Sequence, residues 1–228
     1  MLRFQAVLEV PGLYLCENIV SEEEETIILE GRAQIKPSPY THNQTLDNPH
    51  TTRTGQSNVS DTTQNWFPDW LQEFWRTSME KTNLCEIIKD TGMFDNCYIH
   101  EYASGIVLFP HVDNVGIFGE WICGLSLMSD VTMDFFPPDR KGEVRYYSKK
   151  FFNDGQAVLL PRRSMYIMTG DARFKWAHGI RKVENKRVSL TIRMYIDDHL
   201  LPHVIDERKR YKREVDSREA NSVADERS

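Results

Sequence analysis

The chain has 228 residues, of which 40% are apolar and 11% aromatic, so it is large enough for one folded domain with a hydrophobic core. Its formal net charge of −6 argues against strong non-specific binding to nucleic acid. No apolar run approaches the roughly 20 residues of a membrane helix, no secretory signal is visible, and the four cysteines form no CxxC pair. We therefore expect an intracellular protein, cytoplasmic or nuclear, without a membrane partner.

Two helices are predicted in the first third of the chain. Ser21 followed by Glu24 has the spacing of a capping box, which indicates the start of a helix. Residues 36–65 lack periodicity and are rich in Pro, Thr and Asn, so we expect a long loop of the kind that forms lids or binding segments. Pro68 opens a second helix, with an apolar face that is expected to pack against a sheet and consists of Trp70, Leu71, Phe74 and Trp75.

From residue 96 onward the pattern changes to short strands, at 96–102, 121–127, 131–136, 143–147, 157–160, 164–168 and 187–195. Two helices followed by about seven or eight antiparallel strands predict an α+β domain built on a double-stranded β-helix (jelly roll), with the helices on one sheet. We expect this domain to occupy residues 1–204. Residues 205–228 are charged and contain few aromatics, which predicts a disordered tail or a frayed helix.

The run at 187–195 alternates strictly between apolar and polar residues. One face carries Val188, Leu190 and Ile192, and the other carries four polar side chains: Arg187, Ser189, Thr191 and Arg193. If the polar face lines a barrel interior, the two arginines need an anionic partner, because an unpaired charge in a dry cavity is costly. A small dicarboxylate beside a metal ion would meet that need.

Three residues have the ligand types of a 2-His-1-carboxylate triad, which suits non-haem Fe(II) and leaves open positions on the metal: His111, Asp113 and His178. A lone His-x-Asp is weak evidence, but here it follows a strand, and the two-arginine strand comes after the third histidine. His100 shares a strand face with Tyr102, and that face either lines a polar pocket or forms a satisfied core network. Surface positions are expected for the remaining histidines His42, His50, His199 and His203.

Charge is distributed unevenly along the chain. Acidic residues concentrate in 17–30, and basic residues concentrate in 162–187. The basic stretch predicts either a localised basic rim or an ordinary mixture of solvated surface charges.

Together these residues resemble the AlkB family of Fe(II)/2-oxoglutarate dioxygenases, over about residues 11–195. The resemblance rests on motifs that occur in order: Tyr102-Ala103-Ser104-Gly105, Pro110-His111-Val112-Asp113, Leu125-Ser126-Leu127-Met128-Ser129, Met133-Asp134-Phe135, Pro161-Arg162-Arg163-Ser164, Met168-Thr169-Gly170-Asp171-Ala172-Arg173, His178-Gly179-Ile180 and Arg187-Val188-Ser189-Leu190-Thr191-Ile192-Arg193. The chain is most similar to the AlkB-type domain of tRNA-modifying members.

The resemblance implies a ligand set for each part of the site. Fe(II) is expected on His111, Asp113 and His178, with 2-oxoglutarate and O2 as co-substrates. Contacts to 2-oxoglutarate are expected from Tyr102, Arg187, Thr191 and Arg193, with His100 standing where the family usually has Asn. The loop residues Arg53 and Gly55 resemble part of the nucleotide-recognition lid. Val115 stands where base-repair members carry an acidic residue, which weakens the case for direct repair of alkylated DNA.

We therefore expect an enzyme that hydroxylates or demethylates a modified nucleobase, in RNA or tRNA rather than DNA. One alternative keeps the chemistry and acts on a protein side chain. The other is a non-catalytic binding module on the same fold, against which the intact triad and both arginines count.

Overall fold

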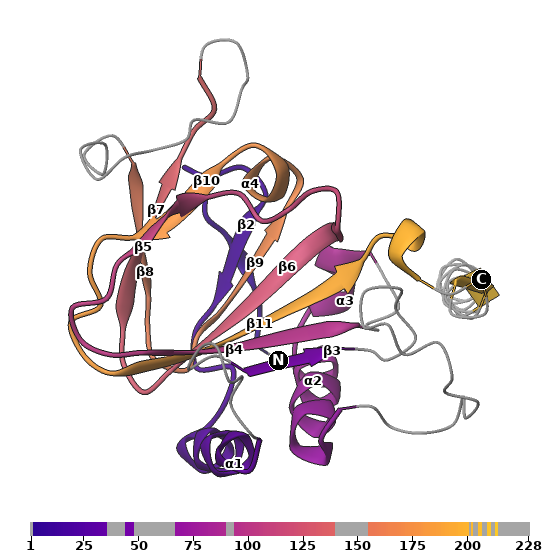
Figure 1. Ribbon diagram of the computed structural model, residues 1–228, viewed down its shortest axis with the longest axis horizontal. Coiled ribbons are helices and arrows are strands. Elements are labelled where there is room, and N and C mark those ends of the chain that lie inside the picture. The colour runs from indigo at the N-terminus through magenta and orange to yellow at the C-terminus, as the bar shows by residue number, and fades with distance from the viewer. Residues whose placement is uncertain are drawn as a thin grey trace, which may run out of the picture.

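The computed structural model describes residues 2–35, 44–47, 67–89, 94–139 and 155–200, together with residues 202, 205, 206, 209, 210 and 213. The predicted strand at 143–147 and the lid residues Arg53 and Gly55 lie outside these described residues. The described residues form two antiparallel sheets with an apolar core between them, and helices cover the larger sheet (Figure 1).

The larger sheet has seven strands, in the order β1 (Gln5–Ala6), β2 (Leu13–Cys16), β9 (Met165–Thr169), β6 (Phe118–Leu127), β11 (Arg187–Tyr195), β4 (Asn96–Tyr102) and β3 (Gln44–Asp47). The smaller sheet has four strands, in the order β5 (Leu108–His111), β10 (Ala177–Ile180), β7 (Val131–Phe136) and β8 (Gln156–Leu160). This arrangement confirms the predicted α+β jelly roll. Five strands of two to four residues, β1, β2, β3, β5 and β10, were not predicted, because so short a run shows little alternation.

Both predicted helices are present and lie on the outer face of the larger sheet, away from the smaller one (Figure 1). In α1 (Glu22–Ala33) the capping box is confirmed, since the Ser21 hydroxyl accepts from the Glu24 amide and the Glu24 carboxylate accepts from the Ser21 amide. In α2 (Asp69–Lys81) the apolar face packs on the sheet, and Trp75 stacks on Trp121 of β6 with 5.6 Å between ring centroids. Two short helices, α3 (Leu84–Ile88) and α4 (Gly170–Phe174), were not predicted.

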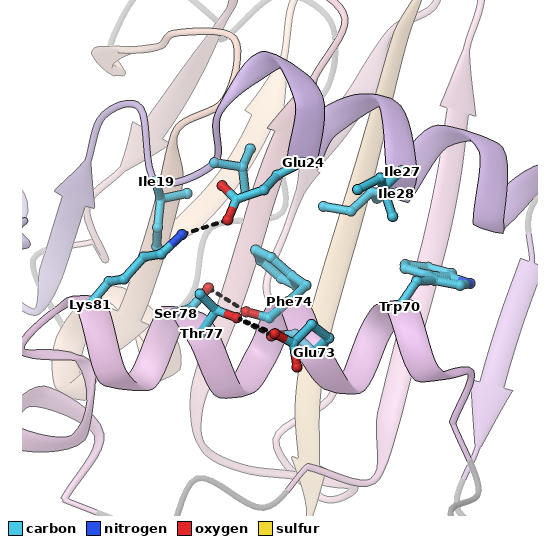
Figure 2. Close-up of a pocket in the computed structure, with 11 residues that line it drawn as sticks. Ile19, Glu24, Ile27, Ile28, Trp70, Glu73, Phe74, Thr77, Ser78 and Lys81 are labelled. Atoms are coloured by element: carbon cyan, nitrogen blue, oxygen red, sulfur yellow. Dashed lines mark hydrogen bonds and ion pairs between the residues drawn. The ribbon is translucent and has the colours of Figure 1, made fainter.

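A groove of about 240 Å³ lies between α1 and α2, with Ile28 and Phe74 facing each other across it (Figure 2). An ion pair between Lys81 and Glu24 closes one end. The Ser78 hydroxyl inside the groove already donates to the Phe74 carbonyl, so the groove presents mainly apolar surface.

None of the described helices is both long and apolar enough to cross a bilayer. All four cysteines are free thiols, and three of them, Cys16, Cys97 and Cys123, are buried. The described residues beyond 200 have helical backbone, while the expected domain boundary at 204 stays a prediction.

Gly124 in β6 lies opposite Tyr166 in β9, and the tyrosine ring occupies the space where a side chain at 124 would stand. A Cβ there would come within 2.2 Å of the ring, and Tyr166 is only 4% exposed and has little freedom to move. We expect Gly124→Ala to lower the free energy of unfolding by about 1–3 kcal/mol through overpacking. Urea denaturation measures this change. Gly119→Ala in the same strand is the matched control, because its Cβ would meet nothing closer than 3.8 Å, and equal losses in both variants would contradict the explanation.

Candidate metal and co-substrate site

The structure brings the predicted triad together at one end of the smaller sheet. His111 ends β5, Asp113 follows two residues later, and His178 lies in β10 directly opposite His111 in the antiparallel register. One ligand atom from each residue lies within 4.8 Å of the others, and the two imidazole rings are 4.5 Å apart. Such a set of two imidazoles and one carboxylate fits Fe(II).

A close approach between two strands creates this geometry. The register of β5 against β10 shifts between His178 and Ile180, so one strand carries an extra residue there. Gly179 permits the contact, because a Cβ at this position would lie 2.7 Å from the Leu108 carbonyl oxygen and 2.8 Å from the Pro110 nitrogen. The motif His178-Gly179 thus supplies a ligand and the space its partner strand needs.

Local contacts orient the two imidazoles of the triad, through a hydrogen bond at His111 and through the carboxylate of Asp113 at His178. His111 Nδ1 lies 2.9 Å from the Phe109 carbonyl oxygen, which only accepts, so Nδ1 carries the proton and Nε2 keeps its lone pair. His178 Nε2 lies 3.6 Å from Asp113 Oδ2 and therefore faces the triad. Burial, followed by the neighbouring His111, lowers the pKa of His178 to about 3, so the ring is a neutral ligand at ordinary pH.

Asp113 is held in its charged form. Burial raises the pKa of this carboxyl, but Arg193 and the two histidines more than offset that effect and leave the pKa below its usual value. The Arg193 guanidinium donates to Asp113 Oδ1 over 2.9 Å. One predicted co-substrate residue therefore contacts a predicted metal ligand directly.

The polar face of β11 points into the space between the sheets, as the alternation predicts. Arg187 is 1% exposed, its Nε donates to the Ser126 hydroxyl over 3.1 Å, and its guanidinium carbon lies 5.4 Å from the centre of the Tyr102 ring. Its Nη2 is buried and has no hydrogen-bond partner among the described residues, and the same holds for Arg193 Nε. Buried guanidinium hydrogens without acceptors indicate a site for an anion.

His100 belongs to the same wall. Strand β4 pairs with β11 so that Tyr102 faces Arg187, His100 faces Ser189, and Tyr98 faces Thr191. The His100 ring lies 4.3 Å from Tyr98 and 5.4 Å from Tyr102. Burial, with Arg193 and Arg187 nearby, lowers the pKa of His100 to about 3, so this imidazole is neutral.

Three residues near the site were missed by the sequence reasoning. Ser126 and Tyr166 approach Arg187 from β6 and β9, and burial raises the pKa of the Tyr166 hydroxyl, which keeps it protonated. Each of these two residues contributes a single hydroxyl to a largely apolar strand, so the sequence gave only a weak indication that it lies in the site. Arg173 was counted with the basic stretch, but it is 1% exposed and donates to main-chain carbonyls beside Asp113.

The remaining cations of 162–187 do not form a free basic rim. Each of them lies in an ion pair with an acidic partner: Arg162 with Glu25, Arg163 with Glu22, Lys175 with Asp171, Arg181 with Asp134, Lys182 with Glu184 and Lys186 with Glu101. Val115, in the turn after Asp113, is 51% exposed. In the part of the chain that the structure describes, the ordinary mixture of surface charges is therefore the better interpretation.

Comparison with known proteins agrees with this geometry. A model of the 2OG-Fe(II) oxygenase superfamily matches residues 15–197. The chain is 31% identical over 185 residues to the tRNA (carboxymethyluridine(34)-5-O)-methyltransferase alkbh8 of Xenopus tropicalis, a match that covers 78% of this chain and 27% of that protein. It is 33% identical over 121 residues to the alkylated DNA repair protein ALKBH8 homolog of Arabidopsis thaliana, covering 43% of this chain and 34% of the relative.

A third relative is the alpha-ketoglutarate-dependent dioxygenase alkB homolog 4 of Mus musculus, 26% identical over 145 residues, with 54% of this chain and 48% of that protein covered. The solved structure of OsALKBH1 superposes with a TM-score of 0.51 at 12% identity and covers 84% of this chain and 99% of that one, which shows a shared fold. This chain spans about a quarter of the length of the Xenopus protein.

His100 and His178 make the metal-free protein sensitive to acid. Both pKa values fall from the usual 6.5 to about 3 on folding, so between those values the unfolded chain binds more protons than the folded one. The free energy of unfolding should therefore decrease as the pH falls through this window, by up to about 1.4 kcal/mol per pH unit for each histidine.

Urea denaturation at several pH values in the presence of a chelator measures this slope. His100→Asn keeps a neutral polar side chain, so the part of the pH dependence of the free energy of unfolding that comes from His100 should disappear in this variant. Identical slopes in this variant and the parent would contradict the assignment.

Proposed function

This chain belongs to the 2OG-Fe(II) oxygenase superfamily and is AlkB-like, and we propose that it oxidises a modified nucleobase in RNA, with tRNA as the first candidate. As a member of this superfamily with the triad in place, it is a dioxygenase that uses Fe(II), 2-oxoglutarate and O2. A non-catalytic binding module on the same fold is accordingly set aside.

In this proposal His111, Asp113 and His178 hold the iron. When iron and 2-oxoglutarate are bound, they supply the oxidation: O2 converts 2-oxoglutarate to succinate and CO2 and places its second oxygen atom in a substrate C–H bond. On an N-methyl group, the hydroxylated product breaks down to formaldehyde and the demethylated base. The protein orients the ligands, keeps the His178 imidazole neutral and shields the site from bulk water.

The observation that carries the proposal is the buried Arg187 guanidinium, whose Nη2 has no hydrogen-bond partner among the described residues. It lies on the same strand face as Arg193, which contacts the predicted metal ligand Asp113. Its planar fork matches a carboxylate, and Ser126 and Tyr102 fix its direction. We assign it to one carboxylate of 2-oxoglutarate. Arg193 has one donor on Asp113 and a buried Nε without a partner, so we place it near the metal-facing end of the co-substrate. Thr191 and His100 line the wall between them.

The substrate assignment rests on the relatives. The name of the Xenopus relative concerns a carboxymethylated uridine at position 34 of tRNA, and that of the Arabidopsis relative concerns alkylated DNA. Both relatives are much longer than this chain, so the methyl transfer in the first name is not carried over. We propose that Arg53 and Gly55 contact the substrate. Further cations that could meet phosphates stand in the sequence at Lys36, Arg140, Lys141, Arg145, Lys149 and Lys150, which also lie outside the described residues.

One observation favours a second candidate substrate. The cations of 162–187 are buried or paired with acids, so this stretch supplies no free basic surface for a phosphate backbone. A protein substrate does not require a basic surface. A protein hydroxylase or demethylase with the same chemistry is therefore the alternative.

The co-substrate assignment predicts the behaviour of Arg187→Lys. An ammonium keeps the positive charge but cannot form the bidentate contact, so the KM for 2-oxoglutarate should rise about 10- to 100-fold, in line with the cost of disrupting a buried charged contact. Succinate formation at varied 2-oxoglutarate measures this change. Lys186→Met is the matched control, because the neighbouring Lys186 is 56% exposed and pairs with Glu101. A KM that rises equally in the control would sink the assignment.

The substrate class is tested by direct turnover. The protein is incubated with Fe(II), 2-oxoglutarate and air, and with total tRNA, methylated DNA oligonucleotides or peptides, and the products are identified by mass spectrometry. We expect a modified nucleoside of tRNA to change together with succinate release, and His111→Ala to abolish both. A modified peptide with unchanged tRNA would favour the alternative. Activity of His111→Ala at the parental level would refute the ligand assignment.

A further inference from the structure

Arg173 is a buried cation that the proposed chemistry does not use. It lies in α4, between β9 and the strand that carries His178, and it is 1% exposed. No carboxylate among the described residues lies within ion-pair distance of its guanidinium. The charge is therefore enclosed in the protein without an anionic neighbour in contact.

The guanidinium instead donates to a ring of main-chain carbonyls. Nη1 donates to the Asp113 oxygen over 3.0 Å, and Nη2 donates to the oxygens of Asn114 and Phe118 over 3.3 and 2.8 Å. Nε donates to the Gly119 oxygen over 3.1 Å. Two of the four acceptors, Asp113 and Asn114, lie in the turn after β5, and the other two, Phe118 and Gly119, are the first residues of β6. The contacted segment begins at the predicted metal ligand. Because the fork is planar and rigid, it fixes the path of the main chain around it.

This contact joins the two chain segments that supply the triad. Arg173 precedes His178 by five residues, and its acceptors begin at Asp113. Other bonds complete the turn, since Asn114 Oδ1 accepts from the Gly116 amide over 2.9 Å and the Ile117 oxygen accepts from the Ile196 amide over 2.9 Å. The turn is therefore held from inside by the guanidinium and from outside by backbone contacts.

Stability alone does not explain a cation at this place. Burying a charge is expensive, and a well-packed apolar residue is often as stable or more so. An apolar residue cannot donate hydrogen bonds to four carbonyl oxygens in the segment 113–119. We therefore attribute the arginine at this position to the need to fix the main chain after Asp113.

We propose that Arg173 is the positioning residue of the metal centre, which holds the main chain after Asp113 so that the carboxylate meets both histidines before a metal arrives. Arg193 then orients the carboxylate itself, while Arg173 orients the backbone that carries it. This role adds to the oxidation proposed above and does not depend on the identity of the substrate.

Arg173→Lys tests the role, because it keeps the charge but presents one nitrogen in place of the fork. Co(II) is titrated into the metal-free 228-residue chain under anaerobic conditions and followed by its visible absorption. We expect the Kd for Co(II) to rise about 10- to 100-fold, as is typical when a residue that orients a ligand is changed. The absorption bands should shift, and amide exchange in 113–119 should become faster.

Arg181→Lys is the matched control. Arg181 follows His178 by three residues, but it is half-exposed and pairs with the buried Asp134 of β7 and not with the segment after Asp113, so its replacement by another cation should leave the Kd within about twofold. A merely structural role for Arg173 would lower Tm while leaving the Kd and the absorption bands unchanged, and that result would overturn the proposal.

Two further outcomes are separable. If the parent protein fails to bind Co(II), the triad assignment fails, and with it the positioning role. If Arg173→Lys does not fold, Asn114→Ala loosens the same turn by removing the acceptor of the Gly116 amide, and an unchanged Kd in that variant would overturn the proposal.

Discussion

The structure depends on positive charge that is buried between its two sheets. Arg187 has no acidic partner in contact among the described residues, and Arg193 shares its only carboxylate partner with the metal site. A folded chain tolerates this arrangement where an anion and a metal complete it, since burying lone charges is costly. The neutral imidazoles of His100 and His178, the rings of Tyr98 and Tyr102, and Asp113 lie near these arginines. The buried guanidinium charge therefore calls for a bound anion between the sheets, and 2-oxoglutarate, the co-substrate of the superfamily, is such an anion.

The sequence predicts those features that have a clear period. Strand 187–195 shows seven or more alternating positions, so its polar face and both arginines could be identified before the structure. The ends of α1 and the apolar face of α2 follow from capping and spacing in the same way. The contact between β5 and β10 has no such signal, because each has four residues and the pairing joins segments more than 60 residues apart. Only the residue types of the triad pointed to it.

Like the contact between β5 and β10, the roles of single buried polar residues could not be predicted from the sequence. Arg173 stands among surface-like basic residues, and nothing in its neighbours distinguishes it from Lys175. Ser126 and Tyr166 are one hydroxyl each in apolar strands. Their roles arise from what the fold places opposite them, which is a property of tertiary contacts. Chemistry inside the barrel is consequently better defined than substrate recognition, because the candidate residues Arg53 and Gly55 lie outside the part of the chain that the structure describes.

Among the described residues between the two sheets, guanidinium groups outnumber carboxylates, and this has a consequence for turnover. Three largely buried arginines, Arg173, Arg187 and Arg193, share this region with Asp113. In the proposed assignment, succinate is a dicarboxylate like 2-oxoglutarate and leaves past the same Arg187 guanidinium that holds the reactant. We therefore expect succinate to compete with 2-oxoglutarate, so that the rate depends on the ratio of these two acids.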